Sequence, residues 1–523
     1  MSYKVCIPTA GTGSRLGELT RYLNKSLVGI ANRPIICHLL EQFPADAKFV
    51  IALGYKGNLV QEFLELAYPD RHFDYAHVVP FEGEGSGLGL SLLACKQHLQ
   101  EPFVFISCDT LVDEFIPPPD KNWMGYAEVQ DLDHYRTLEV AYDRVIEICE
   151  KGAGKFTGYK PYIGLAGIAN HEAFWMAMES GGPKAIQAGE AHGLRALLSN
   201  GIEAKSFTWH DTGNVDALIR AREFYCDPDE PNILEKANEA IWFVGNHAIK
   251  FSNDKEFISN RVERAKELEG FVPSITGSGV NMYRYVKAEG RIFSDVVNLP
   301  LFKSLLDHSA QFWRLEALNA KDKLSFKEKC LWFYRDKTYE RVKLFYKNFS
   351  REDGAEKING LSMPLLKDLL DSIDWDWLAD GLAGRFHGDF HFENILLTSS
   401  DRKFIFLDWR QDFGGDISTG DIYYDFAKLL HGLIVNHELI VGNYYSINWN
   451  DDVINYDFNR KQILVDCEKY FEIWIKDRGY DQKKVLTLTA LIYLNIAALH
   501  HYPYGLLLYA LGKSILKKQL ESK

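Results

Sequence analysis

The sequence predicts an α/β protein with a mixed, mostly parallel sheet and helices on both of its faces, followed by an α+β part with a large helical lobe. Short apolar runs begin the chain, at 4–8, 48–53 and 102–107. They alternate with segments of helical spacing, at 34–43, 58–68 and 89–99, which is the rhythm of βαβ units. Later apolar runs extend the sheet, at 137–142, 145–149, 162–168 and 204–209. Beyond residue 301 the pattern is mostly helical and rich in aromatic residues.

Length and charge bound the possible functions. The chain has 523 residues, enough for two or three domains that each bury a core. Lys and Arg number 59 and Asp and Glu 72, a formal net charge of −13. Broad binding to nucleic acid or to anionic membranes needs a positive surface. We therefore expect no nucleic-acid partner, and a phosphate-bearing ligand must be held by local cations or metal ions.

The cellular setting follows from the cysteines and from the apolar segments. Eight scattered cysteines form no CxxC pair, which favours reduced thiols in a cytoplasmic protein. The first residues read as a strand and not as a signal peptide. The stretch 485–512 carries no charge, but polar residues, Pro503 and Gly505 interrupt it, so we expect buried helices and no membrane insertion.

A Pro- and Asp-rich segment divides the chain. Residues 226–231 have the composition of a linker and fall where the pattern changes. We predict one domain over 1–225 and a second over 232–523. In the second, a small lobe over about 232–290 holds two short strands and a helix from about 255 to 268, and a large lobe covers about 291–523.

The first candidate site follows the first strand directly. There the chain reads Ala10-Gly11-Thr12-Gly13-Ser14-Arg15, a loop in which glycines let backbone N–H groups approach phosphate oxygens. A dinucleotide site would need a third glycine at the right offset and an acidic ribose partner about 20 residues on, and neither is present, which argues against an oxidoreductase. Arg15 and Lys25 beside such a loop instead favour a nucleoside triphosphate.

This loop resembles that of the sugar-phosphate and phosphocholine nucleotidyltransferases, which carry G-x-G-x-R-[LF] followed by a Pro-Lys pair. The resemblance covers about residues 1–225 and implies a Rossmann-like domain in which Arg15 and Lys25 are catalytic. It further implies nucleotide binding by Ala10, Gly11, Thr12, Gly13, Ser86 and Gly87, Mg²⁺ binding by Asp109 and Asp211, and contact of Lys151 with the substrate phosphate. The chain departs from the family pattern at Asn24, in place of Pro, and at Cys108, in place of Gly.

The second candidate site is the segment His387-Gly-Asp389-Phe-His391-Phe-Glu-Asn394, followed by an apolar run that ends in Asp408. One carboxylate can accept the proton of a substrate hydroxyl while an Asn and a second carboxylate hold Mg²⁺ on ATP phosphates. His387 and His391 as a zinc pair are the alternative, which the register of Asp389 and Asn394 disfavours.

The second segment resembles the catalytic and metal loops of the choline kinase and aminoglycoside phosphotransferase family, distant relatives of protein kinases. The resemblance implies a protein-kinase-like domain with Asp389 as the catalytic residue and Asn394 and Asp408 as Mg²⁺ ligands. It also implies that Lys250, paired with Glu263, binds ATP. By the same resemblance, Asp421 and Asp425 are structural.

Together the two sites predict a bifunctional enzyme. Its kinase-like domain would phosphorylate a small hydroxyl compound such as a sugar, a polyol or choline. Its other domain would then couple that phosphate to a nucleotide from an NTP. The family resemblance slightly favours CTP and implies that the product supplies surface polysaccharide synthesis. A nucleotidyltransferase with a pseudokinase domain and a non-catalytic assembly platform are the alternatives. Aromatic residues of the helical lobe either line a cage for a quaternary ammonium or simply fill the core. The sequence leaves the acceptor and the oligomeric state open.

Overall fold

The computed structural model describes residues 3–129, 132–152, 158–226 and 236–521. Its contacts divide the chain into two compact units. The N-terminal unit comprises Met1–Ile258 and Ile275–Lys287, and the C-terminal unit comprises Ser259–Ser274 and Ala288–Lys523. Except for Cys226, the predicted linker 226–231 lies outside the described residues.

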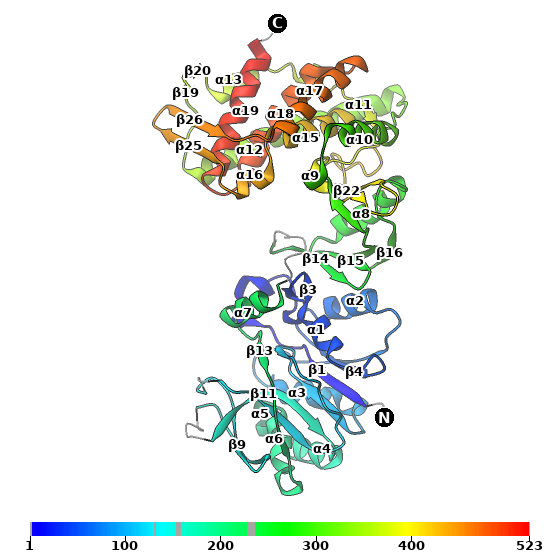
Figure 1. Ribbon diagram of the computed structural model, residues 1–523, viewed down its shortest axis with the longest axis vertical. Coiled ribbons are helices and arrows are strands. Elements are labelled where there is room, and N and C mark those ends of the chain that lie inside the picture. The colour runs from blue at the N-terminus through cyan, green and yellow to red at the C-terminus, as the bar shows by residue number, and fades with distance from the viewer. Residues whose placement is uncertain (1–2, 130–131, 153–157, 227–235, 522–523) are drawn as a thin grey trace. The chain divides into compact units, whose positions relative to one another are not determined.

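A nine-stranded mixed sheet organises the N-terminal unit, with the order β5-β4-β1-β6-β11-β8-β12-β10-β9 (Figure 1). Its first half is parallel, as predicted, and consists of β1 (Lys4–Pro8), β4 (Lys48–Leu53), β5 (Phe73–His77) and β6 (Phe103–Ile106). The central strand β11 (Tyr159–Ile168) is antiparallel to its neighbours. The remaining strands are β8 (Trp123–Tyr126), β9 (Thr137–Ala141), β10 (Arg144–Cys149) and β12 (Glu203–Ser206).

Helices cover both faces of this sheet. Side chains alternate between the faces along each strand, so Val5 and Ile7 enter one core cluster and Cys6 enters the other. The first cluster is closed by α1 (Ile35–Glu41), α2 (Gly57–Ala67) and α7 (Val215–Tyr225). The second is closed by α3 (Leu88–Cys95), α4 (His171–Ser180), α5 (Pro183–Ala188) and α6 (Glu190–Ala196). Burial on both faces explains why the strands read as continuous apolar runs.

A second, antiparallel sheet belongs to the N-terminal unit by its contacts, although the sequence assigned it to the second domain. It has the order β14-β15-β17-β16 and consists of β14 (Glu239–Val244), β15 (His247–Ser252), β17 (Met282–Val286) and β16 (Ile275–Ser278). Trp242 packs edge-on against Phe63 of α2 with ring centroids 5.2 Å apart. Arg284 donates a hydrogen bond to the Leu66 carbonyl at 2.7 Å. The sheet therefore shares a core with α2.

The C-terminal unit is mainly helical, as the sequence predicts. Its helices include α10 (Leu299–Phe312), α11 (Ala320–Leu331), α12 (Lys337–Phe349), α15 (Ile422–Ile434), α17 (Gln462–Asp477), α18 (Gln482–Ala497) and α19 (Tyr504–Glu521). The uncharged stretch 485–512 forms most of α18 and the start of α19, and both are buried. Among the described residues, no helix has the length and apolar character that crossing a membrane demands.

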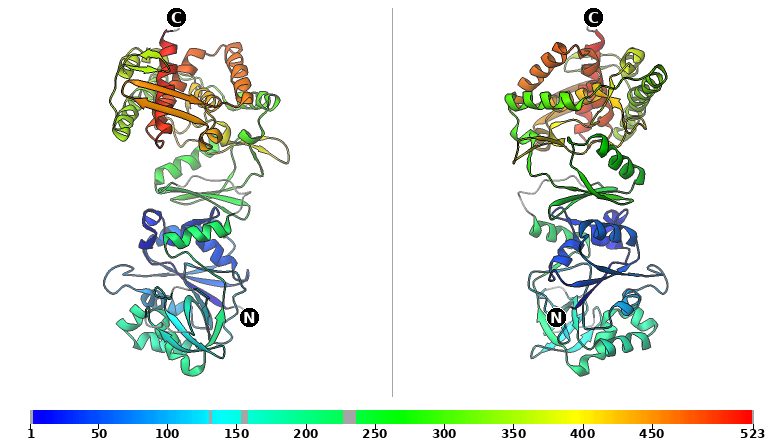
Figure 2. Two further views of the ribbon diagram at one scale, coloured as in Figure 1. Left: turned by 60° about the vertical axis from the view of Figure 1, so that its left-hand side comes forward. Right: turned by 90° about the vertical axis from the view of Figure 1, so that its right-hand side faces the viewer.

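Small sheets complete the C-terminal unit, among them a two-stranded pair of β21 (Ala383–Gly384) and β24 (Gly420–Asp421). A three-stranded sheet contains β18 (Gly290–Ile292), β22 (Ile395–Thr398) and β23 (Phe404–Phe406), and the segment 387–394 leads directly into its central strand β22. A four-stranded sheet contains β19 (Glu356–Ile358), β20 (Leu361–Met363), β25 (Tyr445–Asn450) and β26 (Val453–Phe458). Its orange strands lie against the red helix α19 in the left view of Figure 2.

Candidate active sites

A cavity of about 360 Å³ opens at the end of β1 in the N-terminal unit. Its wall is the phosphate loop together with the start of α3, and it includes these predicted nucleotide-binding residues: Ala10, Gly11, Thr12, Gly13, Arg15, Lys25, Ser86 and Gly87. Ser86 and Gly87 are distant from the loop in sequence. The parallel strand order brings them together, because β1, β4 and β6 end at the same edge of the sheet.

Lys25 and Asp109 form an ion pair at this cavity. The Lys25 Nζ lies 2.5 Å from Asp109 Oδ2, and the Arg15 guanidinium lies 3.9 Å from the same oxygen. Burial would raise the pKa of Asp109, but the charge of Lys25 and its hydrogen bond lower it to about 2. Ser107 donates a further hydrogen bond to Asp109 at 2.6 Å. Asp109 is therefore a carboxylate at every physiological pH.

Asp211 converges on Asp109 through β13 (Trp209–Asp211), whose Asp211 pairs in register with Thr110 of β7 (Thr110–Val112). A Cβ placed on Gly213 would lie 2.8 Å from Asp211 Oδ1 and 3.2 Å from Asp109 Oδ2. Burial and the Asp109 charge raise the pKa of Asp211. Two converging carboxylates fit Mg²⁺, which takes its remaining ligands from phosphates and water. In the described residues no group of three or more His, Cys, Asp or Glu offers a complete metal cage.

Asn24 explains how Lys25 is held, although the sequence registered it only as a departure from the family pattern. Its side chain is fully buried and donates to the carbonyls of Thr9 and Tyr55 at 2.9 and 2.7 Å. Its oxygen accepts from the backbone and the hydroxyl of Ser26. Asn24 thus ties the end of β1 to the turn that carries Lys25. The predicted substrate-binding residue Lys151 is exposed and is not part of the cavity wall.

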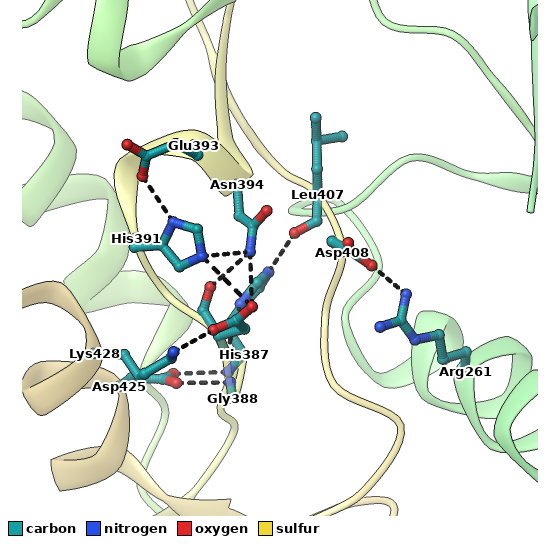
Figure 3. Close-up of polar contacts among 11 residues, drawn as sticks. Arg261, His387, Gly388, His391, Glu393, Asn394, Leu407, Asp408, Asp425 and Lys428 are labelled. Carbon is teal, nitrogen blue, oxygen red and sulfur yellow. Dashed lines mark hydrogen bonds and ion pairs between the residues drawn. The ribbon is translucent and has the colours of Figure 1, made fainter. Parts of the chain in front are cut away.

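The second candidate site is the loop 387–394 of the C-terminal unit, where the carboxylate of Asp389 contacts Lys428 and His391. Figure 3 shows these two side chains at the loop. Lys428 Nζ of α15 lies 2.7 Å from Asp389 Oδ1, and His391 Nε2 lies 3.5 Å from Oδ2. Burial would raise the pKa of Asp389, but Lys428 and His391 hold it well below its usual value. Asp389 in turn raises the pKa of His391 to about 9, against the effect of burial. No role for Lys428 was predicted from the sequence.

Asp425 fixes the loop, as the family resemblance implied. Its carboxylate accepts the backbone N–H groups of His387 and Gly388 at 2.7 Å each and the indole N–H of Trp313 at 3.0 Å. The ring of His387 lies between the Asp389 N–H, 3.2 Å away, and the Leu407 carbonyl, 2.8 Å away. Both ring nitrogens of His387 are thus occupied, which leaves none for zinc.

Asn394 and Asp408 are the predicted metal ligands of this loop. Asn394 donates to the carbonyl of Asp389 at 3.0 Å, and Figure 3 shows its amide oxygen on the side where Asp408 lies. An amide oxygen and a carboxylate are ligands that Mg²⁺ accepts. In the structure the Asp408 carboxylate forms an ion pair with Arg261 of α8 (Lys255–Glu267).

Glu263 was the predicted partner of Lys250, and the structure places it elsewhere. It is exposed and pairs with Lys266 on the same helix at 2.8 Å. The helical repeat of 3.6 residues puts Arg261 and Arg264 on the buried face of α8 and Glu263 on the outer face. Arg261 is therefore the residue of α8 that pairs with Asp408, and Arg264 donates a hydrogen bond to the carbonyl of Phe386, directly before the loop, at 2.8 Å. Lys250 lies within β15 of the N-terminal unit, paired in register with Tyr283 of β17, and its contact with ATP stays a prediction.

Comparison with known proteins supports both resemblances. The phosphotransferase enzyme family matches residues 337–452. Bifunctional protein GlmU of Methanococcus maripaludis is 21% identical over 257 residues, which cover 46% of this chain and 59% of that protein. The UTP–glucose-1-phosphate uridylyltransferase AglF of Haloferax volcanii is 30% identical over 104 residues, 20% of this chain and 41% of that protein. The chain thus spans about 59% of the length of the GlmU relative.

Among solved structures, the CTP:phosphocholine cytidylyltransferase of Streptococcus pneumoniae is 15% identical, with 43% of this chain and 99% of that chain covered and a TM-score of 0.36. The N-terminal half is thus similar in sequence to sugar-phosphate nucleotidyltransferases, and residues 337–452 match the phosphotransferase enzyme family, as the sequence predicted.

Proposed function

We propose that the chain is a bifunctional transferase that phosphorylates a small hydroxyl compound with ATP and then joins that phosphate to a nucleotide from an NTP. The observation that carries the proposal is that each site has its own assembled set of charged groups. Lys25, Arg15 and Asp109 meet at the cavity of the N-terminal unit. Asp389, Asn394 and Lys428 meet at the loop of the C-terminal unit.

At the first site a phosphomonoester oxygen attacks the α-phosphorus of the NTP. A new P–O bond forms, the bond between the α-phosphorus and its bridging oxygen breaks, and pyrophosphate leaves. Both reactants are anionic, so the reaction needs cations that offset their repulsion. Lys25 and Arg15 supply two positive charges, and Mg²⁺ held by Asp109 and Asp211 would neutralise the leaving pyrophosphate.

At the second site Asp389 is the group that orients the hydroxyl of the acceptor and takes its proton as the oxygen attacks the γ-phosphorus. ADP leaves with the electrons of the broken bond. Asn394 and Asp408 would hold Mg²⁺, which would offset the negative charge of the ATP phosphates. Because the pKa of His391 is raised to about 9, its ring is positively charged near pH 7 and adds a second charge beside Asp389.

The order of the two steps, the preference for CTP, the role of Mg²⁺ and a place in surface polysaccharide synthesis extend this proposal. The order follows from the chemistry, because a phosphomonoester made at the second site is the nucleophile that the first site requires. CTP is favoured by the resemblance of the fusion to choline kinase joined to phosphocholine cytidylyltransferase.

A pyrophosphate-release screen of the full chain tests the proposal. The protein is given Mg²⁺, each of the four common NTPs, and a panel of hydroxyl compounds with and without ATP. We expect release that requires both ATP and one acceptor. Release only from an acceptor supplied already phosphorylated would leave the nucleotidyltransferase in place and make the C-terminal unit a pseudokinase. No release under any condition would overturn the proposal.

A further inference from the structure

Three basic side chains lie near the loop 387–394 of the C-terminal unit, and no motif singled them out. Lys337 and Arg341 lie one turn apart at the start of α12, and Arg410 follows Asp408 in the chain. We call them the cation cluster. They stand close enough to act on one another, because the charges of Arg410 and Arg341, together with that of Lys428, lower the pKa of Lys337.

One aromatic ring supports two members of the cluster. The Lys337 Nζ lies 4.1 Å and the Arg410 guanidinium carbon 4.9 Å from the centroid of the Phe333 ring. Phe333 belongs to a π-helical segment, Trp332–Asp336, between α11 and α12. Such segments are rare and occur often at functional sites. The wider turn of this segment therefore interrupts the regular helix at the point where the cations lie against Phe333.

The cluster lacks matching negative charge. In the part of the chain that the structure describes, neither Lys337 nor Arg341 forms an ion pair, and the buried Nε of Arg410 has no hydrogen-bond partner. The carboxylate of Asp412 raises the pKa of Lys337, but its effect is smaller than the lowering by the neighbouring cations. Burial and the neighbouring cations lower the pKa of Lys337 to about 7. In a chain of net charge −13, such an uncompensated group is suited to an anionic ligand.

The cluster borders the acceptor side of the loop. A Cβ on Gly388, the residue before Asp389, would lie 2.6 Å from the Cβ of Arg410, so the Arg410 stem packs directly on the loop. Lys428, which acts on Lys337, contacts Asp389. Figure 3 shows Lys428 on one side of the loop and the proposed metal ligand Asp408 on the other. The nucleotide phosphates belong with Asp408 and Asn394, which leaves the cluster to the acceptor.

We propose that the hydroxyl compound phosphorylated at Asp389 carries an anionic group, a carboxylate, sulfonate or phosphate, and that Lys337, Arg341 and Arg410 bind it. This inference rests on the proposed kinase function and narrows its substrate class. An anion would supply the negative counter-charge that these cations lack, whereas a quaternary ammonium such as choline would be repelled by them. The acceptors of this chain are therefore hydroxy acids or phosphorylated polyols, and not amino alcohols.

Sulfate is the probe that tests the anion site directly. The thermal unfolding midpoint of the full chain is measured with sodium sulfate and with sodium chloride at equal ionic strength, in the presence of saturating Mg²⁺ and ADP. We expect a sulfate-specific rise that falls by at least half in Lys337→Met and in Arg341→Met. Lys343→Met, an exposed position on the same helix, should keep the full rise. An equal rise in all four proteins, or none in the wild type, overturns the proposal.

Matched acceptor pairs test what the anion site is for. ADP release is compared for D-glycerate against glycerol and for D-glucuronate against D-glucose. We expect turnover of the acid of a pair, with its KM raised about tenfold or more in Lys337→Met and the KM for ATP unchanged. If a neutral or cationic acceptor is turned over efficiently, and Lys337→Met does not change that turnover, the inference is overturned. The proposed kinase function then still stands. A raised KM for ATP instead assigns the cluster to the nucleotide and also overturns it. If sulfate raises the unfolding midpoint through Lys337 but no acceptor is phosphorylated with ATP, the anion site stands and the proposed kinase function is refuted.

Discussion

The two sites are anchored by buried side chains of opposite hydrogen-bonding character. In the N-terminal unit the anchor is the neutral amide of Asn24, which donates to the carbonyls of Thr9 and Tyr55. In the C-terminal unit it is the carboxylate of Asp425, which accepts the N–H groups of His387 and Gly388. Both anchors are fully buried.

The difference follows from what each loop must present to its substrate. A phosphate loop binds phosphate through its backbone N–H groups, so an anchor that donates hydrogen bonds to carbonyl groups leaves those N–H donors available. In the proposed kinase step the loop 387–394 acts through a side-chain carboxylate, so its N–H groups are available to fix its course. A noncatalytic anchor can therefore be inferred from the backbone groups that the chemistry does not need.

The largest expected effect separates the two sites by activity. Asp389→Asn removes the group that accepts the hydroxyl proton, and we expect ATP-dependent phosphorylation to fall about 10³-fold. Nucleotidyl transfer from a supplied phosphorylated acceptor should be unchanged, measured as pyrophosphate release. Lys25→Ala should show the reverse pattern. Loss of both activities in either variant would contradict independent sites.

The next effect concerns the anchor of the C-terminal unit. Asp425→Ala leaves three N–H donors without their acceptor, and buried donors are costly to leave unpaired, so we expect a loss of about 3 kcal/mol or more in the free energy of unfolding. Urea denaturation followed by tryptophan fluorescence measures it. Asp425→Asn, which keeps one acceptor oxygen, should lose less. Equal losses in the two variants would mean that the hydrogen bonds do not carry the effect.

The anchor of the N-terminal unit should matter less for stability. Asn24→Ala leaves the carbonyls of Thr9 and Tyr55 without a donor, and an unpaired carbonyl is tolerated better than an unpaired N–H. We expect about 2 kcal/mol in the same urea measurement, together with a raised KM for the NTP because Lys25 loses its support. Phosphorylation at the other site serves as the internal control. A destabilisation larger than that of Asp425→Ala would reverse the comparison.

The smallest effect is a pH dependence of anion binding at the cation cluster. Lys337, faced by Arg341 on its own helix and by Arg410, Asp412 and Lys428 from other elements, has a pKa near neutrality, lowered to about 7. Bound sulfate favours the charged form, so affinity should fall by up to about tenfold as pH rises from 6 to 8. Lys337→Arg keeps its charge in this range and should abolish the dependence. A dependence that persists in Lys337→Arg would assign it to another group.

Much of the N-terminal site is readable from the sequence because it is local. The phosphate loop, Arg15 and Lys25 lie within one βα turn. The strand pattern predicts that Asp109, shortly after β6, lies at the same edge of the sheet. The motif of the C-terminal loop is equally local, so Asp389 and Asn394 are found by spacing. The prediction for Glu263 depended on choosing one face of a helix from the sequence, and in the structure Glu263 pairs with Lys266 on the exposed face while Arg261 of the buried face pairs with Asp408.

The sequence by itself therefore determined the fold class and predicted the two candidate loops with their charged groups, because short-range spacing encodes them. Only the tertiary structure decided which distant side chains surround those loops. Lys428, Arg410 and Lys337 come from three separate elements and carry no motif, and their meeting beside the loop 387–394 depends on the packing of α12 and α15, each of which contacts α18. A charge acts through space and not along the chain, so its partners become visible only when the fold is known.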